Sequence, residues 1–221
     1  MSNINIYIYK FNENHSLKVQ EFFSNYRLDK IQNIISDDYI SRNIQIENII
    51  FEILKKNGFN ESKLNFFVGD NGRPYLIKSD LCFSISHSNE YLVIAISNMN
   101  LAVDIEKIDS KRMKIVKKMY YDLVDYSIDR VIMDWTIKES YIKYYDLNVF
   151  NGIRDIIIDK PNVFGSYGIL EYKSYRLNDF YISIVSKEIE EIVINSVSLD
   201  EKDLISIEKC TKIYESKEEE E

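Results

Sequence analysis

The sequence has few of the residues that build zinc sites and disulfide frameworks. Its 221 residues include two cysteines, Cys82 and Cys210, and two histidines, His15 and His87. The cysteines lie far apart and lack the short spacing of metal-binding motifs, so we expect no zinc site made of histidine and cysteine. So few cysteines are typical of proteins from a reducing compartment, and we expect a cytoplasmic protein.

Long apolar runs are also missing. No stretch approaches the roughly 20 apolar residues that a membrane-spanning helix needs. The first residues, MSNINIYIYKF, lack a charged segment followed by an apolar one, so we expect no signal peptide. These absences exclude a membrane from the partners that we expect.

Positive charge is in deficit overall but is concentrated in one segment. The 28 lysines and arginines against 36 acidic residues give a net charge of −8, which argues against nucleic acid as a main partner. Part of the deficit comes from the C-terminal run KEEEE, and we expect residues 215–221 to form an acidic tail. Between residues 107 and 118 the balance reverses, with Asp109 as the one acid among Lys107, Lys111, Arg112, Lys114, Lys117 and Lys118.

The hydrophobic share of 45% is that of an ordinary globular protein. Amphipathic stretches with capping residues predict helices over 17–35, 38–56 and 134–146. Alternating β-branched and aromatic residues predict strands, punctuated by turn residues, at 4–9, 65–68, 81–86, 91–97, 154–158, 168–177, 180–185 and 192–197.

The order of these elements predicts an α+β fold with two similar lobes in one chain. Each of its two similar lobes would be a helix packed on a small, mostly antiparallel sheet. We expect an N-terminal lobe at 1–98, a C-terminal lobe at 99–214 and the acidic tail at 215–221. Two lobes can enclose a cleft without a second copy, so we expect a monomer.

The stretch 101–109, LAVDIEKID, predicts a strand that carries two carboxylates on one face. Side chains alternate along a strand, so Asp104 and Glu106 point the same way and Ile105 points into the core. Two neighbouring carboxylates repel each other unless a cation lies between them, one is protonated, or both face water. Two interpretations therefore stand, a pair of solvated acids or two oxygen ligands of a hard divalent cation such as Mg²⁺.

The stretch 134–145, DWTIKESYIKYY, predicts a helix with a charged pair on one face. Glu139 and Lys143 are four residues apart and share a face, with Trp135 one turn earlier and Lys138 beside Glu139. A solvated ion pair is one interpretation. In the other, Glu139 adds a third carboxylate to Asp104 and Glu106, and Lys143 holds a phosphate oxygen.

Two further stretches offer donors to an anion. In FSISHS, residues 83–88, an imidazole and hydroxyl groups lie at the end of a strand. In Gly72-Arg73-Pro74 a rigid turn carries an arginine fork suited to phosphate. For each of these stretches a plain hydrogen-bonded turn is the alternative.

Taken together, the four stretches resemble the 4′-phosphopantetheinyl transferases of the surfactin-synthetase-activating (Sfp-like) type. That family has a G-K/R-P turn, an F-x-I-S-H-S strand end, a G-x-D-x-E strand and W-x-x-K-E-x-x-x-K on a helix. This chain has GRP at 72–74, FSISHS at 83–88, AVDIE at 102–106 and WTIKESYIK at 135–143, in the same order. The resemblance implies a two-lobed α+β fold with coenzyme A between the lobes.

The resemblance also implies an activity and its site residues. The 4′-phosphopantetheine group of coenzyme A would move to a serine of an apo carrier protein of acyl, peptidyl or polyketide type, with release of adenosine 3′,5′-bisphosphate. Asp104, Glu106 and Glu139 would hold Mg²⁺, for which Mn²⁺ can substitute, and Asp104, Glu139 and Lys143 would be catalytic. The residues at coenzyme A would be Arg73, Ser86, His87, Ser88, Lys138 and Lys143, with Arg27, Lys30 and Arg42 as candidates for its 3′-phosphate.

Several points stay open at this level. The base for the carrier serine is Glu139 directly or a metal-bound water. The carrier would dock near Lys111, Arg112, Lys117 and Lys118, since carrier proteins are typically acidic. The alternative functions are a non-catalytic module that binds carrier protein or coenzyme A, and a Mg²⁺-dependent phosphohydrolase.

Overall fold

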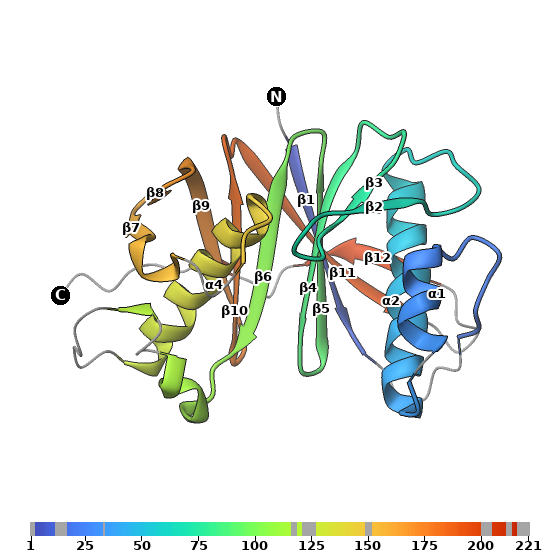
Figure 1. Cartoon of the computed structure of the whole chain (residues 1–221), viewed down its shortest axis with the longest axis horizontal. Coiled ribbons are helices and arrows are strands. Elements are labelled where there is room, and N and C mark those ends of the chain that lie inside the picture. Colours follow the sequence, from blue (N-terminus) through green and yellow to red (C-terminus); the bar gives the residue numbers. More distant parts are fainter. Residues whose placement is uncertain are drawn as a thin grey trace.

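The computed structural model is an α+β molecule in which two sheets pack together between helices (Figure 1). The structure describes residues 3–11, 17–32, 34–115, 119–120, 127–148, 152–199, 205–210 and 214–215. Helices α1 (Asn25–Gln32) and α2 (Asp37–Lys56) lie on one side of the molecule and α4 (Ile128–Tyr144) lies on the other. The α+β class predicted from the sequence is confirmed.

The first sheet has five strands, and all of its neighbours are antiparallel except β1 and β11. In sheet order they are β12 (Ile205–Lys209), β11 (Glu191–Leu199), β1 (Asn3–Lys10), β5 (Tyr91–Ser97) and β4 (Cys82–Ser88). A separate two-stranded ribbon, β2 (Phe66–Val68) with β3 (Pro74–Leu76), carries the 69–73 turn between its strands.

The second sheet is antiparallel throughout. Its order is β6 (Leu101–Lys107), β10 (Phe180–Ser186), β9 (Gly168–Leu177), β8 (Asn162–Gly165) and β7 (Ile157–Asp159), with β13 (Tyr214–Glu215) also paired to β9. Two 3₁₀ turns complete the described elements, η1 (Ser110–Ile115) after β6 and η2 (Ile153–Asp155) before β7.

Strands β11 and β12 return from the C-terminal part of the chain to the first sheet. β11 pairs in parallel with β1 over seven residue pairs, from Asn3 with Glu191 to Tyr9 with Val197. The lobes at 1–98 and 99–214 remain a prediction, and that prediction did not include the pairing of C-terminal strands with the first sheet. The reason is that an isolated run such as 191–199 shows its strand character in the sequence but not its partner.

Three apolar layers hold the elements together. One lies between α2 and the first sheet, and a second lies between α4 and the second sheet. The third joins the two sheets face to face, with Ile6 and Val93 of the first sheet in one cluster with Val103 and Ile105 of the second. Ile105 is therefore in a core as expected, but that core is the one between the sheets.

The long helices begin at capping serines. Ser36 accepts a hydrogen bond from the backbone N–H of Tyr39 at 3.4 Å, and α2 then runs to Lys56 as predicted. Ser127 does the same for the N–H of Arg130 at 3.2 Å, so α4 begins six residues before the predicted start at Asp134. Within the described part of the chain, no helix is both long and apolar enough to cross a bilayer.

Two predicted elements are wrong in extent or type. The helix predicted over 17–35 is confined to Asn25–Gln32, because Ser24 and its neighbours turn the chain first. The strand predicted over 154–158 contains the η2 turn, which starts after Gly152 with a positive φ of 89°. A left-handed residue ends an extended run, and β7 begins only at Ile157.

The edge strands β4 and β6, one from each sheet, lie next to each other in the middle of the molecule (Figure 1). Alternate serines of β4 join them: the Ser84 hydroxyl accepts from the Val103 N–H at 3.1 Å, and the Ser88 hydroxyl accepts from the Lys107 N–H at 3.3 Å. We call this contact the serine seam. It lets two sheet edges meet through side chains, which keeps the carboxylates of β6 beside β4.

A buried ion pair fastens α1 to α2. The Arg27 side chain is 5% exposed and donates from Nε to Glu47 Oε2 at 3.0 Å and from Nη1 to Asn43 Oδ1 at 2.6 Å. Glu47 is fully buried and also accepts from the Ser24 N–H at 2.9 Å. Removal of one member of such a pair leaves a charge buried without compensation.

The substitution Glu47→Gln should destabilise the fold by about 3–5 kcal/mol, because the Arg27 charge then stays buried and unpaired. Urea unfolding measures the free energy of unfolding of each variant. The matched control is Glu52→Gln at an exposed position of the same helix, which should change stability by about 0.5 kcal/mol or less. Equal effects of the two substitutions would show that the buried pair does not hold α1 in place.

Candidate functional site

One pocket of about 470 Å³ lies between the two halves of the molecule and collects residues from all four motifs. Its lining from the N-terminal half includes Tyr26, Arg27, Lys30, Asn43, Gly72, Arg73, Ser84, Ser86 and His87. Its lining from the C-terminal half includes Asp104, Glu106, Glu139, Ile142, Lys143 and Asp146. The pocket is therefore basic on the side of α1 and acidic on the side of β6 and α4.

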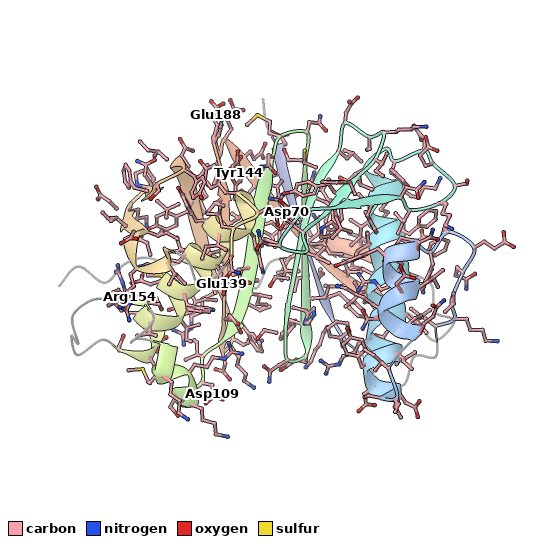
Figure 2. The ribbon with its side chains drawn as sticks, in the orientation of Figure 1. Asp70, Asp109, Glu139, Tyr144, Arg154 and Glu188 are labelled. Carbon is pink, nitrogen blue, oxygen red and sulfur yellow. The ribbon has the colours of Figure 1, made fainter. Side chains whose placement is uncertain are left out.

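The acidic side follows from two simple periodicities. Alternation along β6 turns Asp104 and Glu106 toward α4 and the pocket, while Val103 and Ile105 face the first sheet. The four-residue spacing on α4 places Glu139 and Lys143 on the helix face that points at β6. Figure 2 shows Glu139 on α4 beside the β6 ribbon.

Lys143 and Asp104 form the centre of this acidic side. The Lys143 ammonium lies 2.6 Å from Asp104 Oδ1 and 3.0 Å from the Ser86 hydroxyl. Ser86 itself donates to Asp104 Oδ1 at 2.7 Å across the serine seam. Asp104 is 4% exposed, so this pair lies largely out of bulk water.

Glu106 has a different set of partners. Its Oε2 accepts from the Ser88 hydroxyl at 2.8 Å, and its Oε1 is paired with Arg112 of η1 at 2.7 Å. Burial and the neighbouring Asp104 charge raise the pKa of Glu106 despite these contacts. The basic segment after β6 thus reaches back to one of the two strand carboxylates.

Glu139 is the carboxylate most affected by its surroundings. Burial first, and then the charges of Asp104 and Glu106, raise its pKa to about 7, while Lys143 opposes them. A carboxyl group that titrates near neutral pH can both accept and return a proton. Repulsion from the other two carboxylates contributes to this shift, after burial.

The three carboxylates fit a hard divalent cation in their chemistry. Asp104 Oδ2 is buried and has no hydrogen-bond partner among the described residues, which makes it a ligand atom with no competing contact. In their present positions, however, the described residues include no group of three or more acidic, histidine or cysteine side chains arranged to hold a metal ion. Two of the three carboxylates are instead paired with side-chain cations, Glu106 with Arg112 and Asp104 with Lys143.

The basic side chains near the pocket have hydrogen-bond or ion-pair partners within the protein. Lys30 lines the pocket, donates to the Tyr26 hydroxyl and lies over the Tyr26 ring at 4.3 Å. Arg42 is not among the lining residues of the described chain, and it donates to the Asn89 carbonyl at 2.9 Å. Arg27 lines the pocket but is held by Glu47.

The structure does not bring Lys138 to the pocket within the described part of the chain. Its ammonium donates to the carbonyls of Met119 at 3.1 Å and Ile153 at 3.2 Å, and burial lowers its pKa to about 8. The physical reason is helix phase, since one residue turns a helix by about 100° and Glu139 already faces β6. The role of Lys138 at coenzyme A that the motif predicted is not favoured by this position.

Of the other predicted site residues, some line the pocket, some lie outside it, and some lie outside the described residues. Arg73 lines the pocket, but its guanidinium is turned to backbone carbonyls at the end of α4. Of the predicted docking residues, Lys111 and Arg112 lie on η1, and Lys117 and Lys118 lie outside the described residues. Ser84 was not predicted as a site residue, although the two-residue steps from Ser84 to Ser86 and from Ser86 to Ser88 were a signal for one row of hydroxyls.

Comparison with known proteins supports the motif assignment. No family model matches the chain. It is 32% identical over 127 residues to a 4′-phosphopantetheinyl transferase of Aneurinibacillus migulanus, a match that covers 53% of this chain and 47% of that protein. It is 32% identical over 99 residues to a 4′-phosphopantetheinyl transferase of Bacillus subtilis, covering 40% of this chain and 44% of that protein.

The aligned part spans somewhat less than half of the length of each relative. The predicted resemblance to the 4′-phosphopantetheinyl transferases is confirmed at the level of sequence similarity.

The pKa of His87 depends on burial and on cations from both sides of the pocket. Burial and the charges of Lys143, Arg27, Arg42 and Lys30 lower it, because each disfavours the protonated imidazole. An NMR titration should therefore place the His87 midpoint below the ordinary value of about 6.5, with His15→Gln used to assign the two histidines.

The substitution Lys143→Met should raise the His87 midpoint, because it removes the largest of the charge contributions. Lys55→Met, at the far end of α2, is the control and should leave the midpoint unchanged. A wild-type midpoint at or above 6.5, or no response to Lys143→Met, would contradict this description of the pocket.

Proposed function

We propose that this chain is a 4′-phosphopantetheinyl transferase. It moves the 4′-phosphopantetheine group from coenzyme A to a serine of an apo carrier protein and releases adenosine 3′,5′-bisphosphate. The observation that carries the proposal is the meeting of Lys143 with Asp104 at 2.6 Å in a pocket that also holds Glu139 and a basic opposite side. The two named relatives support the same activity.

In this proposal coenzyme A lies in the pocket with its phosphates toward the basic groups. Lys30 and His87 contact phosphate oxygens, with Ser86 and Ser88 nearby, and Arg42 contributes long-range charge. Such positioning and charge neutralisation provide most of the catalysis in phosphoryl transfer.

Asp104, Glu106 and Glu139 hold Mg²⁺, with Mn²⁺ as a substitute. When bound, the ion neutralises charge on the pyrophosphate oxygens of coenzyme A. Glu106, now paired with Arg112, and Asp104, whose buried Oδ2 has no hydrogen-bond partner among the described residues, would be ligands of the ion together with Glu139.

The chemical step needs a base and a charge acceptor. Glu139 takes the proton of the carrier serine, directly or through a water molecule. The serine oxygen then bonds to the pyrophosphate phosphorus next to pantetheine. The bond from that phosphorus to the bridging oxygen breaks, and Lys143 protonates or pairs with the departing adenosine 3′,5′-bisphosphate.

The carrier protein docks near the basic segment that follows β6. Lys111 and Arg112 lie on η1, and Lys117 and Lys118 belong to the same segment in sequence. A positive patch on an acidic enzyme steers an acidic partner toward the pocket. We propose that acyl, peptidyl and polyketide carrier proteins all dock at this surface.

The architecture that accompanies this function is a monomeric pseudo-dimer located in the cytoplasm. Its two lobes, at 1–98 and 99–214, each pack helix on sheet, with β11 and β12 passing from the second lobe into the sheet of the first. The pocket draws its lining from both halves, which supports the need for two lobes in one chain. Of the proposed acidic tail, residues 215–221, Glu215 pairs with β9 as the end of β13, and residues 216–221 lie outside the described part of the chain.

Incubation with apo carrier proteins, coenzyme A and Mg²⁺ tests the activity directly. Mass spectrometry should show one phosphopantetheine increment on the carrier and an equal amount of adenosine 3′,5′-bisphosphate. The increment should disappear when chelator replaces Mg²⁺. Coenzyme A binding without transfer to any of several acyl and peptidyl carriers would favour a non-catalytic module, and bisphosphate release without an increment would favour a hydrolase.

The substitution Asp104→Asn should lower the transfer rate by about 10²-fold or more, because it removes the charge that Lys143 and the metal ion share. The side chain keeps its shape, so the protein should still fold, as circular dichroism can verify. Asp129→Asn, far from the pocket on the first turn of α4, is the control and should keep wild-type turnover. Near-wild-type turnover of Asp104→Asn would remove Asp104 from the catalytic set.

A further inference from the structure

The guanidinium of Arg73 donates four hydrogen bonds that join three distant segments. Nη1 donates to the carbonyls of Lys143 at 2.7 Å and Tyr144 at 3.0 Å, at the C-terminal end of α4. Nη2 donates to Asn100 Oδ1 at 2.9 Å and to the Leu101 carbonyl at 2.6 Å, at the start of β6. One side chain from the 69–73 turn thus connects the helix and the strand that carry the acidic side of the pocket.

The end of α4 is a place where an arginine is physically suited. The last carbonyls of a helix have no partner within the helix, and they carry the negative end of its dipole. A planar fork with fixed donors can satisfy two such carbonyls and a strand end at once, which the point charge of a lysine cannot do. Arg73 therefore acts as a cap supplied from another part of the chain.

The rest of the turn is fitted against the same helix end. Asn71 donates to the Asp146 carbonyl, and a Cβ at Gly69 would lie 2.0 Å from Asp146 Oδ2, so a side chain there would have to displace the Asp146 carboxyl group. The Arg73 guanidinium lies 4.8 Å from the centre of the Tyr75 ring. Figure 2 labels Asp70 of this turn and Tyr144 at the end of α4, close together in that view.

The two segments that Arg73 joins meet again at the pocket. The residue whose carbonyl accepts from Nη1 is Lys143, whose ammonium lies 2.6 Å from Asp104 Oδ1. Asp104 lies three residues after Leu101, whose carbonyl accepts from Nη2. A shift of α4 against β6 would separate the ammonium from the carboxylate, and the hydrogen bonds of Arg73 to both elements resist that shift.

We propose that Arg73 is a positioning residue that sets Lys143 against Asp104, in place of the nucleotide contact that the Gly-Arg-Pro motif predicts. Both Nη groups are committed to the protein. The remaining donor, Nε, is buried and has no hydrogen-bond partner among the described residues. The catalytic part of this inference rests on the proposed transferase function, whereas the clamp on α4 does not.

Kinetics and nucleotide affinity separate the two roles. Arg73→Lys keeps the charge and loses the fork, so kcat should fall by about 10²-fold, a loss typical of misplaced catalytic groups. KM for coenzyme A, and the affinity for adenosine 3′,5′-bisphosphate measured by calorimetry, should stay near wild type. Lys30→Ala is the matched control and should weaken nucleotide affinity. A loss of nucleotide affinity in Arg73→Lys like that in Lys30→Ala would overturn the positioning role.

A double-mutant cycle tests whether Arg73 acts through Lys143. If it does, Arg73→Lys should add little to the loss of kcat already caused by Lys143→Met. Independent, multiplying losses would overturn the proposal, because they would mean that Arg73 acts on the reaction by another route.

Amide hydrogen exchange tests the clamp without any turnover. The N–H groups of Tyr145, Asp146 and Leu147 bond to carbonyls of the last turn of α4, at 3.3, 3.2 and 3.0 Å. These N–H groups should exchange at least about tenfold faster in Arg73→Lys. The reason is that the hydrogen bonds from the Arg73 guanidinium to the carbonyls at the end of α4 are lost. Unchanged exchange would refute the clamp. If wild type transfers nothing to any carrier, the proposed function fails while this measurement still decides the inference.

Discussion

The contact between β4 and β6 is the constraint on which the rest of this structure depends. Two sheets that pack face to face leave these edge strands side by side, and small hydroxyl side chains at every second position of β4 fill the space between them. Ser84 and Ser88 accept from backbone N–H groups of β6, while Ser86 and Ser88 donate to Asp104 and Glu106. The same row of serines thus joins the halves and orients the two strand carboxylates.

The charges around this seam are balanced by side chains from separate segments. Asp104 is paired with Lys143 of α4, Glu106 with Arg112 of η1, and Glu139 has a pKa of about 7. Because each acid lies near the other two, a charge removed from one changes the protonation of its neighbours. The proposed metal ion would enter this balance by replacing side-chain cations beside the carboxylates, whereas the anionic phosphates of coenzyme A would pair with the cations.

Much of the fold could be predicted because local signals and tertiary structure agree. Ser36 and the acids after it start α2, and the β-branched runs at 91–97 and 101–107 are strands. The errors occurred where a single residue or a partner distant in the sequence decides the extent or the pairing of an element. Ser127 extends α4 by six residues, a left-handed Gly152 prevents a strand at 154, and the pairing of β11 with β1 joins residues almost 190 positions apart.

The sequence by itself determined which candidate side chains share a face, since strand alternation and helix periodicity are local properties. Asp104 with Glu106, and Glu139 with Lys143, follow from those periods alone. Only the tertiary structure decided which groups those side chains meet. Lys138 faces Met119 and Ile153, Arg112 reaches back to Glu106, and Arg73 binds the end of α4. These contacts depend on how packed elements are oriented, and residue spacing carries no information about that orientation.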